Sequence, residues 1–134
     1  MVNSARYLKA HELSNGKLGA TGFCWGGGTT NFLAVTLGAD LQAAVPYYGA
    51  AADTASVPSI KSPLLIQYAE NDERINAMWP EYEKALKAAG VPHEMHMYPG
   101  TQHGFHNNST PRYHEASAKL AWDRTIAFFK KHLA

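Results

Sequence analysis

Residues 17–28 read Lys-Leu-Gly-Ala-Thr-Gly-Phe-Cys-Trp-Gly-Gly-Gly, and this stretch decides the fold. Small and apolar residues lead into Cys24, the only cysteine of the chain, and glycines follow it. A segment of helical character, Thr29–Leu37, comes next and ends before Gly38. The pattern predicts a strand over Lys17–Phe23, a sharp turn at Cys24 and a buried helix behind the turn.

The turn has the Gly-x-Cys-x-Gly form of a nucleophile elbow, with cysteine in place of serine. Because the apex is strained, a side chain at Gly22 or Gly26 is expected to collide with the turn. The turn raises the Cys24 sulfur to a helix N-terminus, where the dipole favours the nucleophilic thiolate. The backbone N–H of Trp25 is then expected to serve an oxyanion hole. The alternative is that Cys24 is a small buried hydrophobic residue, the usual state of a free cysteine.

The composition indicates one globular domain, with 134 residues, 46% hydrophobic and 17% charged. A net charge of +1 without a basic run argues against nucleic acid or an anionic membrane as a partner. A single cysteine excludes an internal disulfide and any Cys-x-x-Cys pair. The first residues are polar and no apolar run reaches membrane-spanning length, so we expect a cytoplasmic protein.

Apolar runs alternate with helical patterns along the rest of the chain, which predicts an α/β fold with about four parallel strands flanked by helices. Beyond the first strand and its helix, the expected strands are Ala43–Tyr48, Pro63–Ala69 and His93–Tyr98, and the expected helices are Ser4–Leu13, residues 75–89 and Arg112–Leu133. Pro46 is awkward in its strand because it removes a ladder donor. Residues 50–62 and 99–111 are expected to be loops.

Three reactive side chains follow predicted strands: Cys24 the first, Asp72 the third and His103 the fourth. Functional groups of a parallel sheet gather beyond the carboxyl ends of its strands. In that arrangement Cys24 attacks a carbonyl and His103 takes the thiol proton and returns it to the leaving group. Asp72 holds the imidazole in the right tautomer and stabilises its charged form.

Some of these assignments have competitors close by in the sequence. Glu70 and Glu73 lie beside Asp72, and His106 lies in the same loop as His103. The histidines at positions 93 and 96 face opposite sides of a regular strand and therefore cannot form a metal pair.

The motifs together resemble the dienelactone hydrolase family of α/β hydrolases. They are Gly22-Phe23-Cys24-Trp25-Gly26-Gly27, Tyr47-Tyr48-Gly49, Glu70-Asn71-Asp72-Glu73, Tyr98-Pro99-Gly100 and His103-Gly104-Phe105, with Ala121-Trp122, Arg124-Thr125 and Phe128-Phe129 near the C-terminus. The order nucleophile, acid, histidine is the one that α/β hydrolases use. The resemblance implies a triad of Cys24, His103 and Asp72 that cleaves esters or lactones through a thioester, without metal or cofactor.

The resemblance covers only the C-terminal half of the family fold, so residues 1–134 are expected to form one truncated α/β-hydrolase domain. The second oxyanion N–H, which comes from the other half, then has no counterpart. The strand Lys17–Phe23 becomes a sheet edge that lacks the usual protection. We therefore expect a homodimer joined near Lys17–Phe23. The alternative is a monomer in which Ser4–Leu13 folds back over the edge.

The sequence constrains the substrate weakly. An apolar pocket is expected from the aromatic side chains Trp25, Tyr47, Tyr48 and Phe105. Between Arg74 and Arg112 the only cations are Lys84 and Lys87, so the His103 loop offers no obvious carboxylate clamp. Small neutral esters are therefore favoured, with lactones second.

Two functions other than hydrolysis stay open at this point. One is a half-fold with a vestigial triad that acts as a fragment or binding module. The other is a thiol redox sensor, against which the lack of a resolving cysteine counts.

Overall fold

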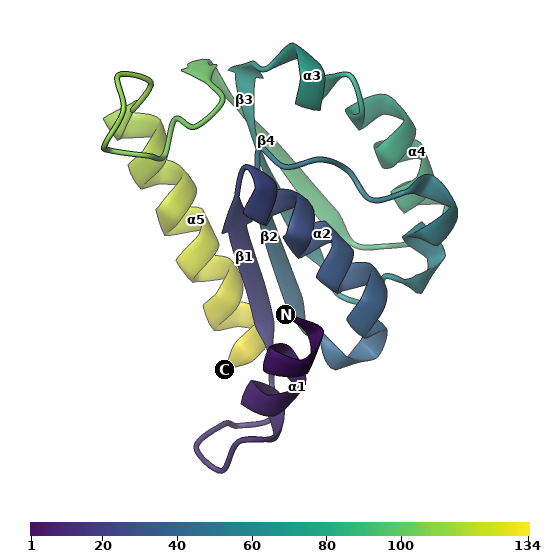
Figure 1. The fold of residues 1–134 in the computed structure, drawn as a ribbon. Coiled ribbons are helices and arrows are strands. Elements are labelled where there is room, and N and C mark those ends of the chain that lie inside the picture. Colours follow the sequence, from purple (N-terminus) through teal and green to yellow (C-terminus); the bar gives the residue numbers. More distant parts are fainter.

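Four parallel strands in the order β1-β2-β3-β4 make up the sheet in a computed structural model that describes residues 1–134 (Figure 1). The strands are β1 (Gly19–Phe23), β2 (Ala43–Tyr47), β3 (Leu64–Asn71) and β4 (His93–Gln102). The α-helices are α1 (Val2–Ala10), α2 (Trp25–Leu37), α3 (Glu73–Asn76), α4 (Trp79–Ala88) and α5 (Glu115–Leu133), and 3-10 helices span Gly38–Asp40 and Thr54–Ser59. The predicted α/β class is confirmed.

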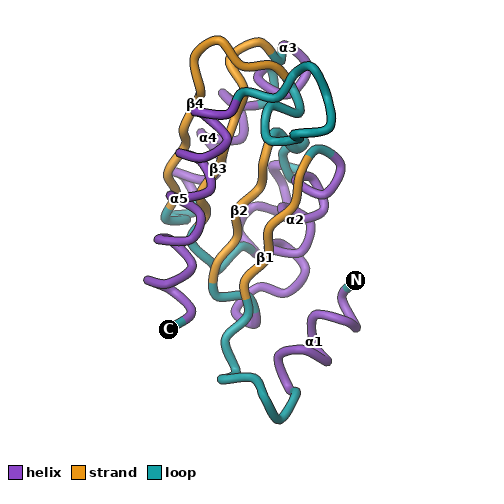
Figure 2. Tube along the Cα trace, turned by 90° about the vertical axis from the view of Figure 1, so that its left-hand side faces the viewer, coloured by secondary structure: helices purple, strands orange, loops and turns teal.

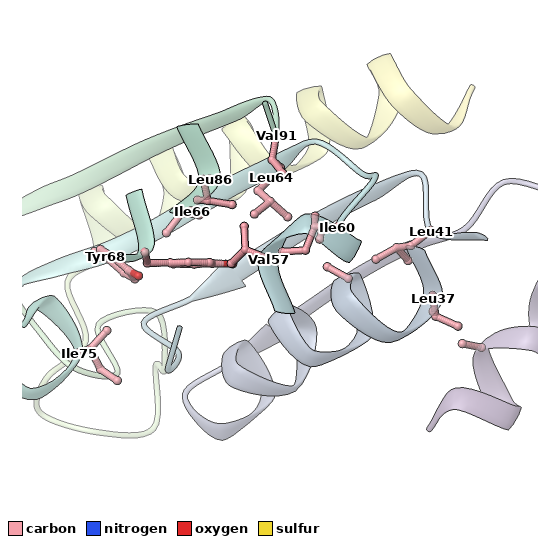
Figure 3. Close-up of a cluster of buried hydrophobic side chains, with 14 residues drawn as sticks. Leu37, Leu41, Val57, Ile60, Leu64, Ile66, Tyr68, Ile75, Leu86 and Val91 are labelled. Atoms are coloured by element: carbon pink, nitrogen blue, oxygen red, sulfur yellow. The ribbon is translucent and has the colours of Figure 1, made fainter. Parts of the chain in front are cut away.

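Helices cover both faces of the sheet, with α2 and α4 on one side and α5 on the other (Figures 1 and 2). Successive side chains of β3 enter two separate cores because side chains alternate along a strand. Leu64 and Ile66 belong to the core under α2 and α4 (Figure 3), whereas Leu65 and Ala69 belong to the core under α5. A strand buried on both faces must be apolar at nearly every position, which explains why β3 was easy to predict.

Several element boundaries differ from the sequence-based expectation. Strand β4 continues through Pro99 to Gln102, where a loop was expected, with an irregular register opposite Ala69–Asn71. The single helix expected over residues 75–89 is two helices, α3 and α4, with Pro80 in the first turn of α4 as predicted. Helix α2 begins at Trp25, directly after the turn.

Pro46 lies inside β2 and removes one hydrogen bond of the ladder. The N–H groups of Ala44 and Tyr48 point toward β3 and donate to Pro63 O (3.1 Å) and Gln67 O (2.7 Å). The N–H missing at Pro46 falls between these two. The strand tolerates the proline because the bonds on either side of it are kept.

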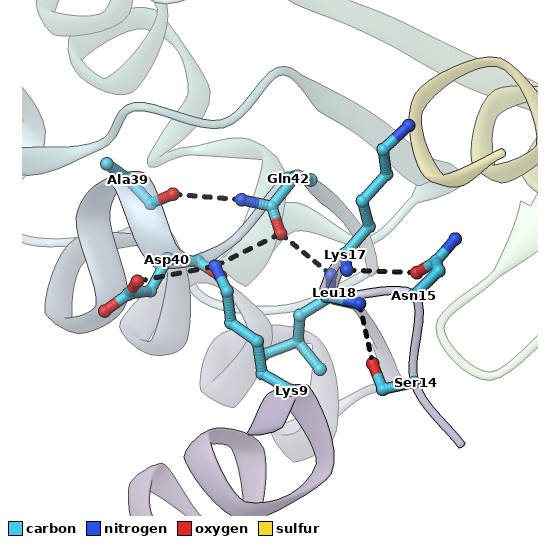
Figure 4. A network of polar contacts seen from close by, with 9 residues as sticks. Lys9, Ser14, Asn15, Lys17, Leu18, Ala39, Asp40 and Gln42 are labelled. Atoms are coloured by element: carbon cyan, nitrogen blue, oxygen red, sulfur yellow. Dashed lines mark hydrogen bonds and ion pairs between the residues drawn. The ribbon is translucent and has the colours of Figure 1, made fainter. Parts of the chain in front are cut away.

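Helix α1 packs beside the end of α2 and does not extend the sheet (Figure 2). Lys9 Nζ donates to Asp40 O (2.7 Å), and Gln42 Oε1 accepts from Leu18 N (2.8 Å), so polar contacts join the end of α1, the 3-10 turn after α2 and the entry to β1 (Figure 4). The expected helix over Ser4–Leu13 thus exists, but it leaves β1 as an edge strand.

The carboxyl ends of all four strands meet at one edge of the sheet, because the strands are parallel. The start of α2, the short helix α3 and the segment after β4 lie together there, at the top of Figure 1. No helix of the chain is both long enough and apolar enough to cross a bilayer.

Candidate active site

The turn between β1 and α2 is strained at Cys24, whose backbone has φ 58° and ψ −116°. A Cβ on Gly22 would lie 2.2 Å from the carbonyl oxygen of Gly26, so position 22 accepts only glycine without movement of the turn. A Cβ on Gly26 would meet nothing within 4 Å. The expectation that both glycines avoid collision is therefore right for Gly22 and wrong for Gly26.

A second pair of glycines fixes where α2 begins. A Cβ on Gly27 would lie 2.4 Å from Tyr47 O, and one on Gly49 would lie 2.2 Å from the carbonyl carbon of Gly27. The first turn of α2 and the end of β2 are thus in direct backbone contact. The sequence motifs contain both glycines, but their mutual contact is visible only in the folded chain.

The structure brings Cys24, His103 and Asp72 together in one hydrogen-bonded row. His103 Nε2 lies 3.0 Å from Cys24 Sγ, and His103 Nδ1 lies 2.5 Å from Asp72 Oδ2. The Asp72 side chain is only 7% exposed, whereas Cys24 is exposed. Cys24 is therefore not the buried hydrophobic residue of the alternative interpretation.

The competing residues lie elsewhere. Glu70 Oε2 accepts a hydrogen bond from Gly100 N (2.7 Å) and so joins β3 to β4. His106 packs between the rings of Phe23 (4.9 Å) and Trp122 (5.8 Å), and partial burial there lowers its pKa. Only His103 contacts both the thiol and a carboxylate.

Asn76, a residue that sequence reasoning missed, joins α3 to the end of β3. Its Nδ2 donates to Ala69 O (2.8 Å) and to Glu70 O (3.1 Å), and its backbone N donates to Asp72 O (2.9 Å). Asp72 is the residue before the first turn of α3, and Asn76 is the last residue of that helix. The sequence gives no signal of this role, because the side chain bonds only to backbone carbonyl groups.

A cavity of about 430 Å³ opens beside the thiol. Its lining consists of Cys24, Trp25, Gly28, Thr29, Phe32, Ala50, Ala51, Arg74 and Ile75. Arg74 is the one charged residue among them and takes part in no ion pair.

Of the four aromatic residues expected to line a pocket, Trp25 lines the cavity beside Cys24 and the other three do not. Tyr47 and Phe105 are fully buried in the core under α5. Tyr48 is 1% exposed and touches a different hollow, beside Phe23 and His106.

The His103 loop was expected to offer no carboxylate clamp, but two arginines lie near the site. Arg74 lines the cavity beside Cys24. Arg112 packs against the turn that follows His103. A Cβ placed on Gly104 would lie 3.6 Å from the guanidinium carbon of Arg112.

The backbone N–H of Trp25 is not used by the hydrogen bonds of α2. The first backbone bonds to Cys24 O come from Gly27 N (3.0 Å) and Gly28 N (3.2 Å). Trp25, the first residue of α2, precedes these donors, so its N–H lies outside the helical hydrogen-bond ladder. No group of three or more histidine, cysteine or acidic side chains is arranged to hold a metal ion.

A parallel sheet with a strained turn, an imidazole and a carboxylate at one edge defines an α/β hydrolase. The model of the dienelactone hydrolase family matches residues 2–133. The chain belongs to the dienelactone hydrolase family.

Relatives from distant organisms agree with this assignment. A Salmonella typhi protein with a carboxymethylenebutenolidase name is 35% identical over 127 residues, which cover 87% of this chain and 47% of the relative. One from Saccharolobus solfataricus with the same kind of name is 32% identical over 129 residues, or 92% of this chain and 49% of the relative. The chain therefore spans about half the length of these relatives.

Solved structures show the same fold. A Klebsiella pneumoniae structure with a dienelactone hydrolase name has a TM-score of 0.79 and 32% identity, over 86% of this chain and 52% of the other. A dienelactone hydrolase-like promiscuous phosphotriesterase from metagenomic libraries has a TM-score of 0.86. Its identity of 22%, over 98% of this chain and 59% of the other, shows likeness of fold alone.

Proposed function

We propose that this chain hydrolyses small carboxylic esters or lactones through a thioester formed on Cys24. The observation that carries the proposal is the row of atoms from Cys24 Sγ through the His103 ring to Asp72 Oδ2, with separations of 3.0 and 2.5 Å. These are the contacts that an activated cysteine nucleophile requires: a base within reach, and a carboxylate that orients the base.

The reaction then has two halves. His103 Nε2 takes the thiol proton, and the Cys24 sulfur attacks the carbonyl carbon to give a tetrahedral oxyanion near the Trp25 N–H. Collapse breaks the bond to the leaving oxygen, which receives the proton from His103, and leaves the acyl group on sulfur. Water then gives a proton to His103 and attacks the thioester, which releases the acid and restores the thiol. With a lactone the leaving oxygen stays attached, so the product is a hydroxy acid.

We expect turnover by residues 1–134 alone to be slow. The nucleophile elbow supplies one oxyanion donor, the N–H of Trp25, and the second comes from a segment with no counterpart among residues 1–134. Loss of one such donor typically costs about 10²–10³ in kcat.

The cavity beside Cys24 favours a small substrate with a negative charge. Phe32 and Ile75 supply apolar walls, and Arg74 adds a positive charge that no carboxylate neutralises. A carboxylate on the ester or lactone therefore fits this cavity better than the neutral group expected from the sequence.

The chain is also proposed to form a homodimer through β1. Two backbone groups of the β1 segment, Leu18 O and Cys24 N, bond to β2. Because backbone N–H and C=O groups alternate in direction along a strand, those of Gly19, Thr21 and Phe23 face away from β2. An edge strand of this kind pairs readily with another strand. A cytoplasmic location stays a prediction from the polar N-terminal residues.

Turnover of a short-chain nitrophenyl ester tests the proposed function. We expect wild-type activity to fall to background in Cys24→Ala and in His103→Ala. His106→Gln is the matched control, because His106 lies in the same segment as His103 but contacts neither Cys24 nor Asp72. Equal background rates in all four proteins would support the non-catalytic alternative.

A further inference from the structure

Tyr48, the residue after β2, has an unusual backbone for a bulky side chain. Its φ is 33°, a region that residues other than glycine rarely adopt, and it is 1% exposed. Its N–H donates to Gln67 O (2.7 Å), which holds the strained backbone against β3. Strain at a residue with a large buried side chain persists only where the surroundings fix it, and such residues cluster at functional sites.

The side chain of Tyr48 contacts the segment that carries His103 at two points. Its ring lies 5.0 Å from the imidazole of His103 and 5.4 Å from the ring of Phe105. The backbone of His106 lies close to its hydroxyl group. Burial raises the pKa of Tyr48 to about 12, so the phenol is neutral at physiological pH.

The segment after β4 needs such support because its backbone turns sharply beside the imidazole. His103 directly follows the last residue of β4 and precedes Gly104, whose φ is 88°. Asp72 holds only the Nδ1 side of the ring. Backbone bonds such as Phe105 N to Gln102 O (3.0 Å) hold the turn, and the ring of Tyr48 packs against the imidazole.

We infer that Tyr48 is a positioning residue, which keeps His103 Nε2 within reach of the Cys24 sulfur by packing its ring against His103 and Phe105. The inference rests on the proposed function, and it gives Tyr48 a role other than that of a pocket wall. Its effect is exerted through His103, without contact to the substrate.

Tyr47 provides a matched control. It is as deeply buried as Tyr48, and its hydroxyl lies 2.7 Å from Thr125 Oγ1 on α5. Substitution by leucine removes one buried aromatic ring at either position. Only the ring of Tyr48 packs against His103 itself.

The experiment compares Tyr48→Leu and Tyr47→Leu by ester kinetics, thermal unfolding and the pH dependence of Cys24 alkylation by iodoacetamide. We expect Tyr48→Leu to lower kcat by roughly fivefold to tenfold with KM unchanged, as the loss of one aromatic contact with the imidazole allows. The pH midpoint of alkylation should also rise, because the thiolate loses its well-placed imidazole. Tyr47→Leu should change thermal stability by a similar amount and leave kcat and the midpoint at their wild-type values.

A wild-type kcat and alkylation midpoint in Tyr48→Leu would overturn the inference, as would equal changes in both variants. Failure of the proposed function gives a different result, namely ester turnover that survives in Cys24→Ala. If the wild type shows no turnover, the alkylation profiles of the two variants decide the question alone.

Discussion

At Cys24 the backbone, and not only the side chain, determines where the sulfur lies. Its N–H donates to Tyr47 O (3.1 Å), and its carbonyl oxygen accepts from Gly27 N and Gly28 N. A strained backbone conformation costs on the order of 1–3 kcal/mol. The hydrogen bonds of Cys24 and the close packing at Gly22 keep the residue in this conformation. The sulfur is therefore presented to His103 in one orientation.

Arg74 gives a prediction at the same scale. We expect Arg74→Gln to raise KM for a nitrophenyl ester with a free carboxylate by about threefold to tenfold, since an exposed guanidinium attracts an anion modestly. KM for a neutral ester of the same length should not change. The carboxylate preference of the wild type should also weaken at high salt, because the charge is screened.

Lys84→Gln is the control for this substitution, because it removes the same charge from α4, outside the cavity. Both variants are assayed with both esters at one ionic strength. If Arg74→Gln changed KM equally for the charged and the neutral ester, Arg74 would have no role in selecting an anion.

Between elements, the contact of α2 with the end of β2 controls the geometry of the site. Gly49 and Gly27 touch through their backbones, so neither position has room for a side chain. This contact places the N-terminus of α2 beside the strand end that leads into Tyr48. The elbow and the support for His103 are therefore joined through the end of β2.

Gly49→Ala tests this contact. We expect the free energy of unfolding in urea to fall by about 3 kcal/mol, the upper end of the usual cost of overpacking, because the new Cβ would meet backbone that cannot move aside. Gly26→Ala is the control: its Cβ meets open space in a helix, so stability should stay the same or rise by up to about 1 kcal/mol. Equal losses in both variants would contradict the close contact.

The sequence predicted elements and chain order better than it predicted packing. Glycines and buried apolar runs identified β1, β3 and the order Cys24, Asp72, His103, because these signals are local. The extension of β4 was missed because Pro99 and Gly100 have the composition of a loop. The Glu70 carboxylate, thirty residues earlier, accepts from the Gly100 N–H.

The pocket residues were predicted less well for the same reason. Tyr47 and Phe105 are aromatic and lie near the site in sequence, but α5 covers the sheet face to which they point. The hydroxyl of Tyr47 pairs with Thr125, 78 residues away. No local pattern distinguishes an aromatic residue that lines a cavity from one that a distant helix buries.

For the whole molecule, the outer edge of β1 is the exposed feature that matters most. Phe23 at its end is 38% exposed and Trp25 beside it is 74% exposed. Helix α1 is anchored through Lys9 to Asp40 and does not pair with β1. Unpaired backbone groups and exposed aromatic rings at one place favour association of two copies.

Static light scattering at tens of micromolar should therefore show twice the monomer mass. In an antiparallel pair of β1 strands around a two-fold axis, Thr21 faces its own copy, so Thr21→Pro removes a central inter-chain donor. Thr21→Pro loses the bond from the Thr21 hydroxyl to Val45 O (2.8 Å) but no backbone bond to β2, so it should lose some stability, keep its circular dichroism spectrum and become monomeric. A monomeric wild type, or a dimeric Thr21→Pro, would rule out this mode of pairing.

The central claim is that Cys24 carries the acyl group during turnover. The most direct measurement is mass spectrometry of the intact protein and its peptides after acid quench of a reaction with a nitrophenyl ester. We predict that the peptide containing Cys24 gains the mass of the acyl group during turnover. This modified peptide should disappear when the ester is exhausted, and it should be absent from Cys24→Ala. Steady ester turnover that vanishes in His103→Ala while Cys24 stays unmodified, or that survives in Cys24→Ala, would contradict it.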